Sequence, residues 1–510
     1  MPCDRRGKAG RGRARHPPRM IHFAIILCVL AIHLRDPAVA AFGPPAFAPL
    51  PAAILSIGGF ILLNLLTDRS VRRLGRAVDQ TGSWHAVHRA EHLVRRARLL
   101  AVGLHLVNVV LVGWAESVRS VTTDLILIDE LVVIAPLVAS WCIGWWSLAP
   151  IERRVREAAL IRDLDSGVAL RPFVTRGQFV LSNLRYHVLI ALVPILLLVA
   201  WAETIERHGA RWFGVVPGSA AAVLIQISGV AVLFTLMPLG LRLVWDTVPL
   251  GPGPLRDAIT ALCRQSRVRV GNLLVWRTHG LMLNGAVIGL FWPLRYILLT
   301  DALLEALTPD QVEAVAAHEV GHVRRRHLPW LAAAMLAAVT GIGMTLSVVQ
   351  ISLAIAVPGL ASSALAEGLM AMITLAMSLT VLGFVSRTFE RQADAFAVCA
   401  LSRRAAGTRE AGPSPVVTPE AVTSMRAALS VVAHASGLPI RKFTWRHGSI
   451  LDRQRRLDAM VGRPMNRLAI DREARWMKVA IALGLIAVLS IMVGGYLLAS
   501  VIFPAGASHP

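Results

Sequence analysis

One short segment of the 510-residue chain carries side chains at a spacing suited to metal chemistry. His318 and His322 lie four residues apart, and Glu319 follows the first of them, which gives the pattern His-Glu-x-x-His. On a helix this spacing places both imidazoles on one face, where both reach a single tetrahedral Zn²⁺. Glu319 then lies beside the open coordination position, suited to act as general base and acid for metal-activated water. We therefore expect His318 and His322 to be metal ligands and Glu319 to be catalytic.

A zinc site with two histidines needs a third protein ligand, and a later segment of the chain offers one. Glu390 is the expected ligand, and Asp394 follows it by one turn on the same helical face. From that position Asp394 can accept the remaining N–H of a ligating histidine and fix its tautomer. The alternative is a ladder of surface charges formed by Arg387, Glu390 and Asp394, which is less favoured beside the histidine motif.

The residues before the histidine motif have the types found at a helix start. Thr308 suits the N-cap, Pro309 suits the first helical position, and Gln311 completes a capping box. Alanine and valine then favour a helix that continues to His327, and Pro329 indicates its end or a kink. The histidine motif is therefore expected on one continuous helix.

Short runs of β-prone residues precede that helix, at 273–276, 284–290 and 294–300. An extended polypeptide can pair with the exposed edge of such strands, because its backbone hydrogen bonds hold it in register. The scissile amide of a substrate would then lie over the metal. The pattern favours a small sheet that binds substrate beside the zinc helix.

The composition around these segments is that of a membrane protein. Hydrophobic residues make up 55% of the chain and charged residues only 16%, below the roughly 25% usual for soluble domains. The mean hydropathy is +0.59, and five scattered cysteines exclude a disulfide scaffold or a cysteine metal site. Nine uncharged stretches are candidate spans. They lie near residues 20–34, 46–66, 99–115, 131–150, 186–202, 213–240, 329–357, 366–386 and 479–503.

Basic residues predict how the chain is oriented. The chain has 53 Lys+Arg against 31 Asp+Glu, a formal charge of +22, and its basic segments alternate with weakly charged ones. The positive-inside rule then predicts that the N-terminus, residues 241–328 and residues 387–474 are cytoplasmic. These arginines flank apolar spans, so anionic lipid is the expected partner rather than nucleic acid. Residues 1–40 also resemble a cleavable signal peptide.

Asp129 and Glu130 stand at the start of one apolar stretch. We interpret them as marking the outer interface, because the uncharged residues after them suffice to span the bilayer alone. An intramembrane role in transport is the less favoured alternative.

Residues 250–460 resemble the HtpX-like and CAAX prenyl protease group of membrane zinc metallopeptidases, which are gluzincins. Members of this group carry the same histidine motif and a glutamate ligand followed by an Ala-Asp pair, as in Glu390 with Ala393-Asp394. The group's Asn-Ala segment and its His-Pro-Ser with a downstream Arg are similar to Asn284-Gly285-Ala286, and to His447-Gly448-Ser449 with Arg453. The resemblance implies a zinc metalloendopeptidase with one Zn²⁺ per chain.

The resemblance also implies roles for three residues outside the metal ligands. Asn284 is expected at the substrate-binding edge, and His447 or Arg453 is expected to stabilise the developing oxyanion. Arg453 is accordingly a candidate for substrate binding and His447 for catalysis. The alternative for both is a basic patch that touches lipid head groups.

We therefore predict a mainly α, polytopic transmembrane protein with a small α+β gluzincin domain at the cytoplasmic face. The expected division has six parts: a basic tail (1–19), a multi-span region (20–245), the first part of the peptidase domain (246–328), a transmembrane hairpin (329–386), the second part of that domain (387–474) and a C-terminal helix with a short tail (475–510).

The expected activity is hydrolysis of polypeptides, including membrane proteins, in quality control or processing at a bacterial inner membrane. Two alternatives stay open: a dedicated signalling protease and a non-catalytic zinc-binding scaffold.

Overall fold

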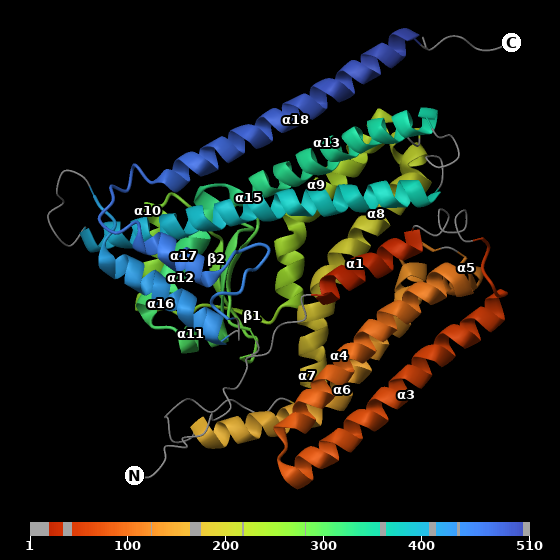
Figure 1. Ribbon diagram of the computed structural model, residues 1–510, viewed down its shortest axis with the longest axis horizontal. Helices are drawn as coiled ribbons and strands as arrows, with labels where there is room; N and C mark the ends of the chain where they lie inside the picture. Colours follow the sequence, from red (N-terminus) through yellow and green to blue (C-terminus); the bar gives the residue numbers. More distant parts are fainter. Residues whose placement is uncertain are drawn as a thin grey trace. The chain divides into compact units, whose positions relative to one another are not determined.

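The computed structural model describes most of the chain, and its residues fall into two compact units. The described residues are 20–33, 43–123, 125–163, 175–216, 219–280, 282–356, 364–406, 415–435 and 439–502. The basic tail 1–19, the end of the signal-like segment at 34–40 and the tail after 502 lie outside them. One unit covers residues 17–246, and the other includes residues 247–510. The mainly helical fold class expected from the sequence is confirmed (Figure 1).

The first unit is entirely helical in its described residues. Its elements are α1 (Met20–His33), α3 (Pro49–Thr81), α4 (Trp84–Val107), η1 (Asn108–Val112), α5 (Trp114–Thr122), α6 (Ile128–Asp163), α7 (Arg176–Asn183), η3 (Leu184–Leu189), α8 (Ile190–Phe213) and α9 (Ala220–Val244). Phe60, Trp141 and Trp145 lie in its largest buried cluster, together with apolar residues of α1 and α8. Packing of these side chains joins α1, α3, α6 and α8 into one body.

Seven described helices are long and apolar enough to cross a membrane, and an eighth span results if one bent pair is counted. The expected stretch 20–34 forms α1, whose 14 residues are fewer than the about 20 that a bilayer requires. The expected stretch 99–115 is interrupted at Gly113, whose φ is 97°, and the helices on either side meet at 70°. Seven of the nine expected stretches therefore form long helices, while these two form a short helix and a broken one.

The second unit combines a small sheet with helices. Its elements are β1 (Thr247–Pro249), α10 (Pro254–Gln265), β2 (Asn272–Trp276), β3 (Gly285–Ile288), β4 (Tyr296–Thr300), α11 (Asp301–Ala306), α12 (Pro309–Arg324), α13 (His327–Ala356), α15 (Ala364–Ala406), α16 (Pro419–Ala435), α17 (Ile450–Asp458) and α18 (Ala469–Ile502). The long helices α13, α15 and α18 run alongside one another (Figure 1).

The sheet has the order β1-β2-β4-β3, with β2 and β4 parallel and both outer strands antiparallel to their neighbours. The three expected β-prone runs form β2, β3 and β4. β1 was not predicted, because three residues that include a proline carry little strand signal. β3 pairs with β4 on one side only, which leaves its other edge facing α12.

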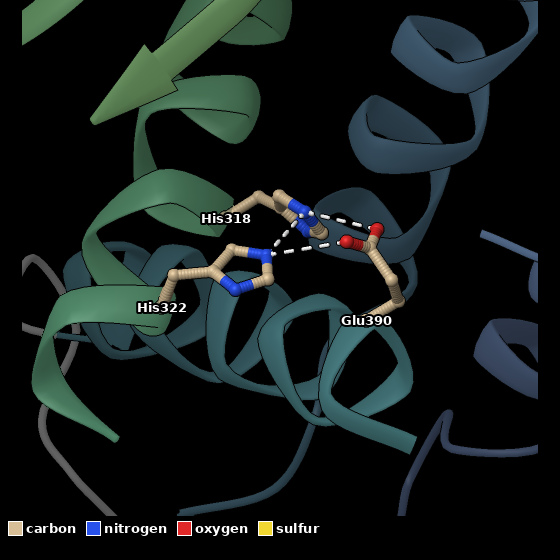
Figure 2. Close-up of side chains that lie close together, drawn as sticks. All are labelled: His318, His322 and Glu390. Carbon is tan, nitrogen blue, oxygen red and sulfur yellow. Dashed lines mark hydrogen bonds and ion pairs between the residues drawn. The ribbon is translucent and has the colours of Figure 1, made fainter. Parts of the chain in front are cut away.

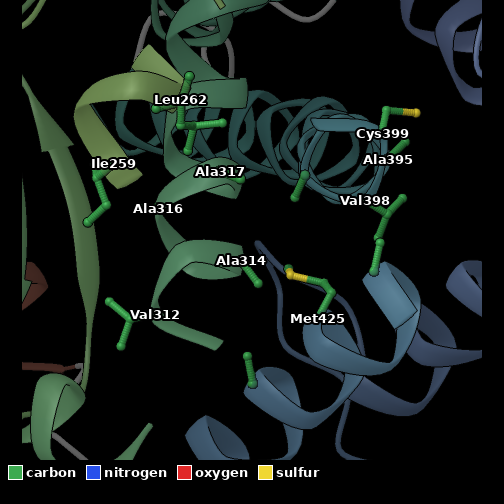
Figure 3. Close-up of a cluster of buried hydrophobic side chains, with 14 of the residues drawn as sticks. Ile259, Leu262, Val312, Ala314, Ala316, Ala317, Ala395, Val398, Cys399 and Met425 are labelled. Atoms are coloured by element: carbon green, nitrogen blue, oxygen red, sulfur yellow. The ribbon is translucent and has the colours of Figure 1, made fainter. Parts of the chain in front are cut away.

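The core of this second unit lies where α12 crosses α15. Small residues of α12 (Ala314, Ala316, Ala317) meet Ala395 and Val398 of α15, and all five side chains are buried (Figure 3). Because alanine side chains are short, the two helices can approach closely. This packing sets the distance between the histidine motif on α12 and the acidic residues on α15.

The helix of the histidine motif starts as expected and ends earlier than expected. The N–H of Thr308 donates to Oε1 of Gln311 (3.2 Å), and Pro309 occupies the first turn. The expected continuation to His327 is wrong, because α12 ends at Arg324 and Arg326 adopts a left-handed φ of 54°. His327 instead begins α13, where Pro329 falls in the first turn and its missing N–H leaves no helical bond unmade.

Candidate metal centre

Three side chains from α12 and α15 converge on one point (Figure 2). Nε2 of His318 lies 3.1 Å from Nε2 of His322. Oxygens of the Glu390 carboxylate lie 3.6 Å from each of these nitrogens. His318 and His322 come from successive turns of α12, whereas Glu390 comes from α15, across the core described above. The three residues named from the sequence are thus brought together.

The separations fit a single zinc ion. Ligand atoms about 2.0–2.1 Å from a tetrahedral zinc lie about 3.3 Å from one another, close to the three observed distances. Two imidazoles and one carboxylate are also a donor set typical of catalytic zinc sites. Burial disfavours the charged form of His318, yet the neighbouring Asp394 and Glu390 carboxylates raise its pKa to about 10. The surroundings therefore favour a positive charge at this point.

A buried acid holds His318 from behind. Oδ1 of Asp394 lies 2.9 Å from Nδ1 of His318, which directs Nε2 of this imidazole toward the metal position. The guanidinium of Arg453 donates from Nε to Oδ2 of Asp394 (2.8 Å) and from Nη2 to Oδ1 (2.6 Å). Only 8% of Arg453 and 2% of Asp394 is exposed. The pair is therefore a bidentate ion pair inside the protein.

A second chain of contacts reaches His322, and sequence reasoning missed it. Nδ1 of His327 lies 3.0 Å from Nδ1 of His322, and its Nε2 lies 3.0 Å from Oε1 of Gln392. The amide nitrogen of Gln392 donates to Asp471 (2.6 Å), so its Oε1 is the group that accepts from His327. His327 then accepts from Nδ1–H of His322, which leaves the Nε2 lone pair of His322 for the metal.

The sequence gives only a weak indication of the contacts that run from His322 through His327 to Gln392. Gln392 lies between the two acids Glu390 and Asp394, and His327 is the only other histidine within ten residues of the motif. Neither fact indicates a contact, because the contact depends on where α12 ends. His327 is also stacked on Phe389, with ring centroids 4.4 Å apart and an interplanar angle of 4°.

Glu319 lies at the free edge of the sheet. Oε2 of its carboxylate accepts from the N–H of Val287 in β3 (3.2 Å), a group that points away from β4. Burial raises the pKa of Glu319 to about 7. A Cβ on Gly285 would lie 2.8 Å from Val315 of α12, so β3 and α12 are in close contact. The edge strand thus lies directly beside the expected general base.

Three further residues named from the sequence lie at different places. His447 is 46% exposed at its side chain, and its Nδ1 lies 2.9 Å from Oε2 of Glu390. Asn284 precedes β3, with its backbone bonded to Thr300 and its side chain exposed. Arg453, expected to bind substrate, instead directs its guanidinium to Asp394, and Nη1 lies 3.7 Å from Glu390. His447 borders the candidate metal position, while Arg453 lies behind it.

Several long apolar helices, with two histidines, a glutamate and an additional carboxylate at one buried point, are an arrangement typical of membrane metalloproteases. Residues 279–460 match the sequence profile of peptidase family M48, and the resemblance expected from the sequence is confirmed over these residues. The match contains both the zinc helix and the acidic segment of α15. Metalloproteases of this family use zinc.

Two other comparisons add context. A crystal structure of S. mikatae Ste24p aligns with a TM-score of 0.43 and 14% sequence identity, covering 82% of this chain and 100% of that chain. The comparison with curated protein sequences found no match.

Proposed function

We propose that this protein is an integral-membrane zinc endopeptidase in which His318, His322 and Glu390 hold the metal. The observation that carries the proposal is the convergence of these three side chains, with separations of 3.1, 3.6 and 3.6 Å, beside the carboxylate of Glu319. Each ligating nitrogen is oriented by a buried partner, Asp394 behind His318 and His327 behind His322. Such partners raise the basicity of metal ligands and fix their tautomers.

The proposed chemistry divides between the metal and the chain. A bound zinc ion supplies Lewis-acid activation of water and of the substrate carbonyl. Glu319 takes a proton from the attacking water and passes it to the leaving amine. A carboxylate with a pKa near 7 suits both steps, because it can accept and donate a proton near neutral pH.

The substrate is proposed to bind as an additional strand at the free edge of β3. The N–H of Val287 faces this edge and at present donates to Glu319. An extended polypeptide pairing there would lie between the sheet and the zinc helix, with Asn284 at the end of the edge. Such pairing recognises the backbone of the substrate through main-chain hydrogen bonds, so it suits a protease that cleaves many different sequences.

His447 is assigned to the oxyanion and Arg453 to positioning. The exposed His447 side chain borders the metal position and can donate to charge developing on the substrate carbonyl. Arg453 is buried and acts through Asp394, which in turn orients His318. It is therefore a positioning residue in this proposal.

The proposed biological role is quality control or processing of membrane proteins, with the site at the cytoplasmic face of a bacterial inner membrane. The alternating basic segments of the sequence support this orientation. An edge strand as binding surface supports an unfolded, extended substrate over a single folded partner. A dedicated signalling protease would need a surface for its one partner, and a non-catalytic scaffold would not need Glu319.

The experiment that tests the proposal compares the purified, detergent-solubilised wild type with Glu319→Gln. Zinc content and cleavage of unfolded casein are measured for both proteins. We expect about one zinc in this site in each, and a loss of activity of at least about 10²-fold in the variant, because the ligands stay and the proton acceptor is removed.

Asp310→Asn is the matched control, because it makes the same chemical change at an exposed position on the same helix. It should cleave casein like the wild type. Equal activity of Glu319→Gln and wild type would refute the assignment of the general base. If all three proteins, the wild type included, bind zinc and none cleaves casein, the result would favour the alternative of a non-catalytic zinc-binding scaffold.

A further inference from the structure

A second group of metal-binding side chains lies in the first unit, outside the family match. His33 is the last residue of α1, Glu130 lies in the first turn of α6, and Glu203 lies in the second half of α8. Nε2 of His33 is 3.9 Å from Oε1 of Glu130 and 3.9 Å from Oε1 of Glu203. One donor atom from each residue lies within 4.8 Å of the other two. Three helices therefore direct one donor each to a common point.

The orientation of His33 is that of a metal ligand. Its Nδ1 lies 3.1 Å from the carbonyl oxygen of Val29. A carbonyl can only accept, so Nδ1 carries the proton, and the Nε2 of the neutral ring presents a lone pair to the two carboxylates. At 3.9 Å neither carboxylate is within hydrogen-bond distance of this nitrogen. Nε2 of His33 and the carboxylate oxygens of Glu130 and Glu203 can all donate an electron pair to a metal ion, and they face one another across a space.

The two glutamates are buried without a Lys or Arg partner among the described residues. Glu130 is 0% exposed, and the side-chain hydrogen-bond partner of its carboxyl group is another acid, Asp129. Oε2 of Glu203 has no hydrogen-bond partner among the described residues, and the side chain of Glu203 is 15% exposed. A buried carboxylate without a cation or donors costs several kcal/mol, so such groups are normally paired or bound to a metal.

Asp129, the acid next to Glu130 in the sequence, forms an ion pair with Arg119. Nε of Arg119 lies 3.0 Å from Oδ2 of Asp129, which is an ion pair with a buried acid. Arg119 thus supplies one positive charge beside three neighbouring acids, Asp129, Glu130 and Glu203. When all three acids are ionised, two negative charges remain, and a divalent cation would neutralise them.

We propose that His33, Glu130 and Glu203 form a second metal site, which binds a divalent transition-metal ion such as Zn²⁺. One imidazole and two carboxylates suit zinc and its neighbours better than Mg²⁺ or Ca²⁺, which prefer oxygen ligands alone. The side chain of His33 is 33% exposed, which leaves a path for the ion and room for a water as fourth ligand. The ion joins α1, α6 and α8, so it stabilises the first unit.

The test measures zinc per chain in the full-length protein. His318→Ala with His322→Ala removes the peptidase site, and this background should still retain one zinc after dialysis against micromolar Zn²⁺. Adding Glu130→Gln should lower that content to below about 0.1 per chain, because one charged ligand is replaced by a weak one. Glu206→Gln is the control, since it makes the same change at an exposed position one turn further along α8. It should keep the zinc.

If Glu130→Gln does not fold, a second variant tests whether the metal site exists. His33→Ala changes a partly exposed residue at a helix end, and it should abolish the rise in unfolding temperature that added Zn²⁺ produces in the background protein. A background protein without zinc would overturn the proposal, as would zinc binding or zinc stabilisation that survives His33→Ala. The three side chains would then share a proton rather than an ion. A failure of the peptidase proposal is visible separately, in the activity of Glu319→Gln.

Discussion

Asp394 connects a buried cation to a proposed metal ligand. Its two oxygens receive a bidentate guanidinium from Arg453, and one of them also lies beside Nδ1 of His318. The position of the His318 imidazole therefore depends on Arg453, which lies 135 residues further along the chain. A change at Arg453 should therefore affect both stability and metal binding.

Arg453→Met should destabilise the protein by about 3–5 kcal/mol, because it leaves Asp394 as a buried charge without its partner. The measurement is the free energy of unfolding in detergent, with zinc affinity determined on the same samples. Arg456→Met is the matched control, since its ion pair with Asp452 is about half exposed and should contribute less than about 1 kcal/mol. Equal losses in the two variants would contradict a special role for the buried pair.

His327→Phe should weaken zinc binding about 10- to 100-fold, as expected for the loss of a group that orients a ligand. Phenylalanine keeps a ring that can stack on Phe389 and removes both nitrogens that join His322 to Gln392. Competition with a chromogenic chelator gives the affinity. His434→Phe, at an exposed position of α16, should leave the affinity unchanged. Unchanged affinity in His327→Phe would mean that His322 needs no such support.

At the residue scale, the sequence permits the proposed metal ligands and the supporting Asp394 to be named, but not the contact between His322 and His327. The spacing of His318 and His322 fixes a shared helical face before any tertiary contact forms. The contact between His322 and His327 depends on a left-handed residue at Arg326, and arginine has no preference for that conformation. Nothing in the local sequence predicts it.

At the scale of elements, the contact between β3 and α12 places the edge strand beside the zinc helix. A methyl group on Gly285 would lie 2.8 Å from Cγ1 of Val315, closer than side chains tolerate. The backbone of β3 can therefore approach the helix only because residue 285 has no Cβ. The distance between Glu319 and the sheet depends on the same contact.

Gly285→Ala should destabilise the protein by about 1–3 kcal/mol through overpacking, and should also reduce casein cleavage by shifting the strand edge. Val315→Ala removes the methyl group that the new side chain meets. The double variant should thus be more stable than the sum of the two single changes predicts, which a double-mutant cycle of unfolding free energies measures. Simple additivity would argue against a direct clash.

The elements were predictable to different degrees. Three strands and the start of α12 follow from local signals, namely β-prone runs and a capping box. The early end of α12 and the bend at Gly113 do not, because neither an arginine at 326 nor a single glycine in an apolar stretch indicates where a helix ends. The order of the strands is also non-local, since β4 lies between β2 and β3 although it follows both in sequence.

At the scale of the whole molecule, the charge pattern predicts which segments share a side of the membrane. Single cysteines can test this, because the four described native cysteines are buried or half-buried and only Cys3 needs replacement by serine. Arg211→Cys, at the end of α8, should react with an impermeant maleimide in intact cells. Arg446→Cys, near His447, should react only after permeabilisation. The reverse pattern would place the peptidase site outside.

Helix α15 runs without a proline from Ala364 to Ala406, so the apolar residues that can lie in the bilayer and the carboxylate of Glu390 belong to one rigid rod. Sliding this rod by a single residue's rise moves Glu390 by about 1.5 Å. Metal–ligand distances tolerate only about 0.2 Å. A lipid composition that changes bilayer thickness, and with it the depth or tilt of α15, would therefore act directly on Glu390, the proposed third ligand. The thickness of the membrane would then influence how tightly the proposed site holds its metal.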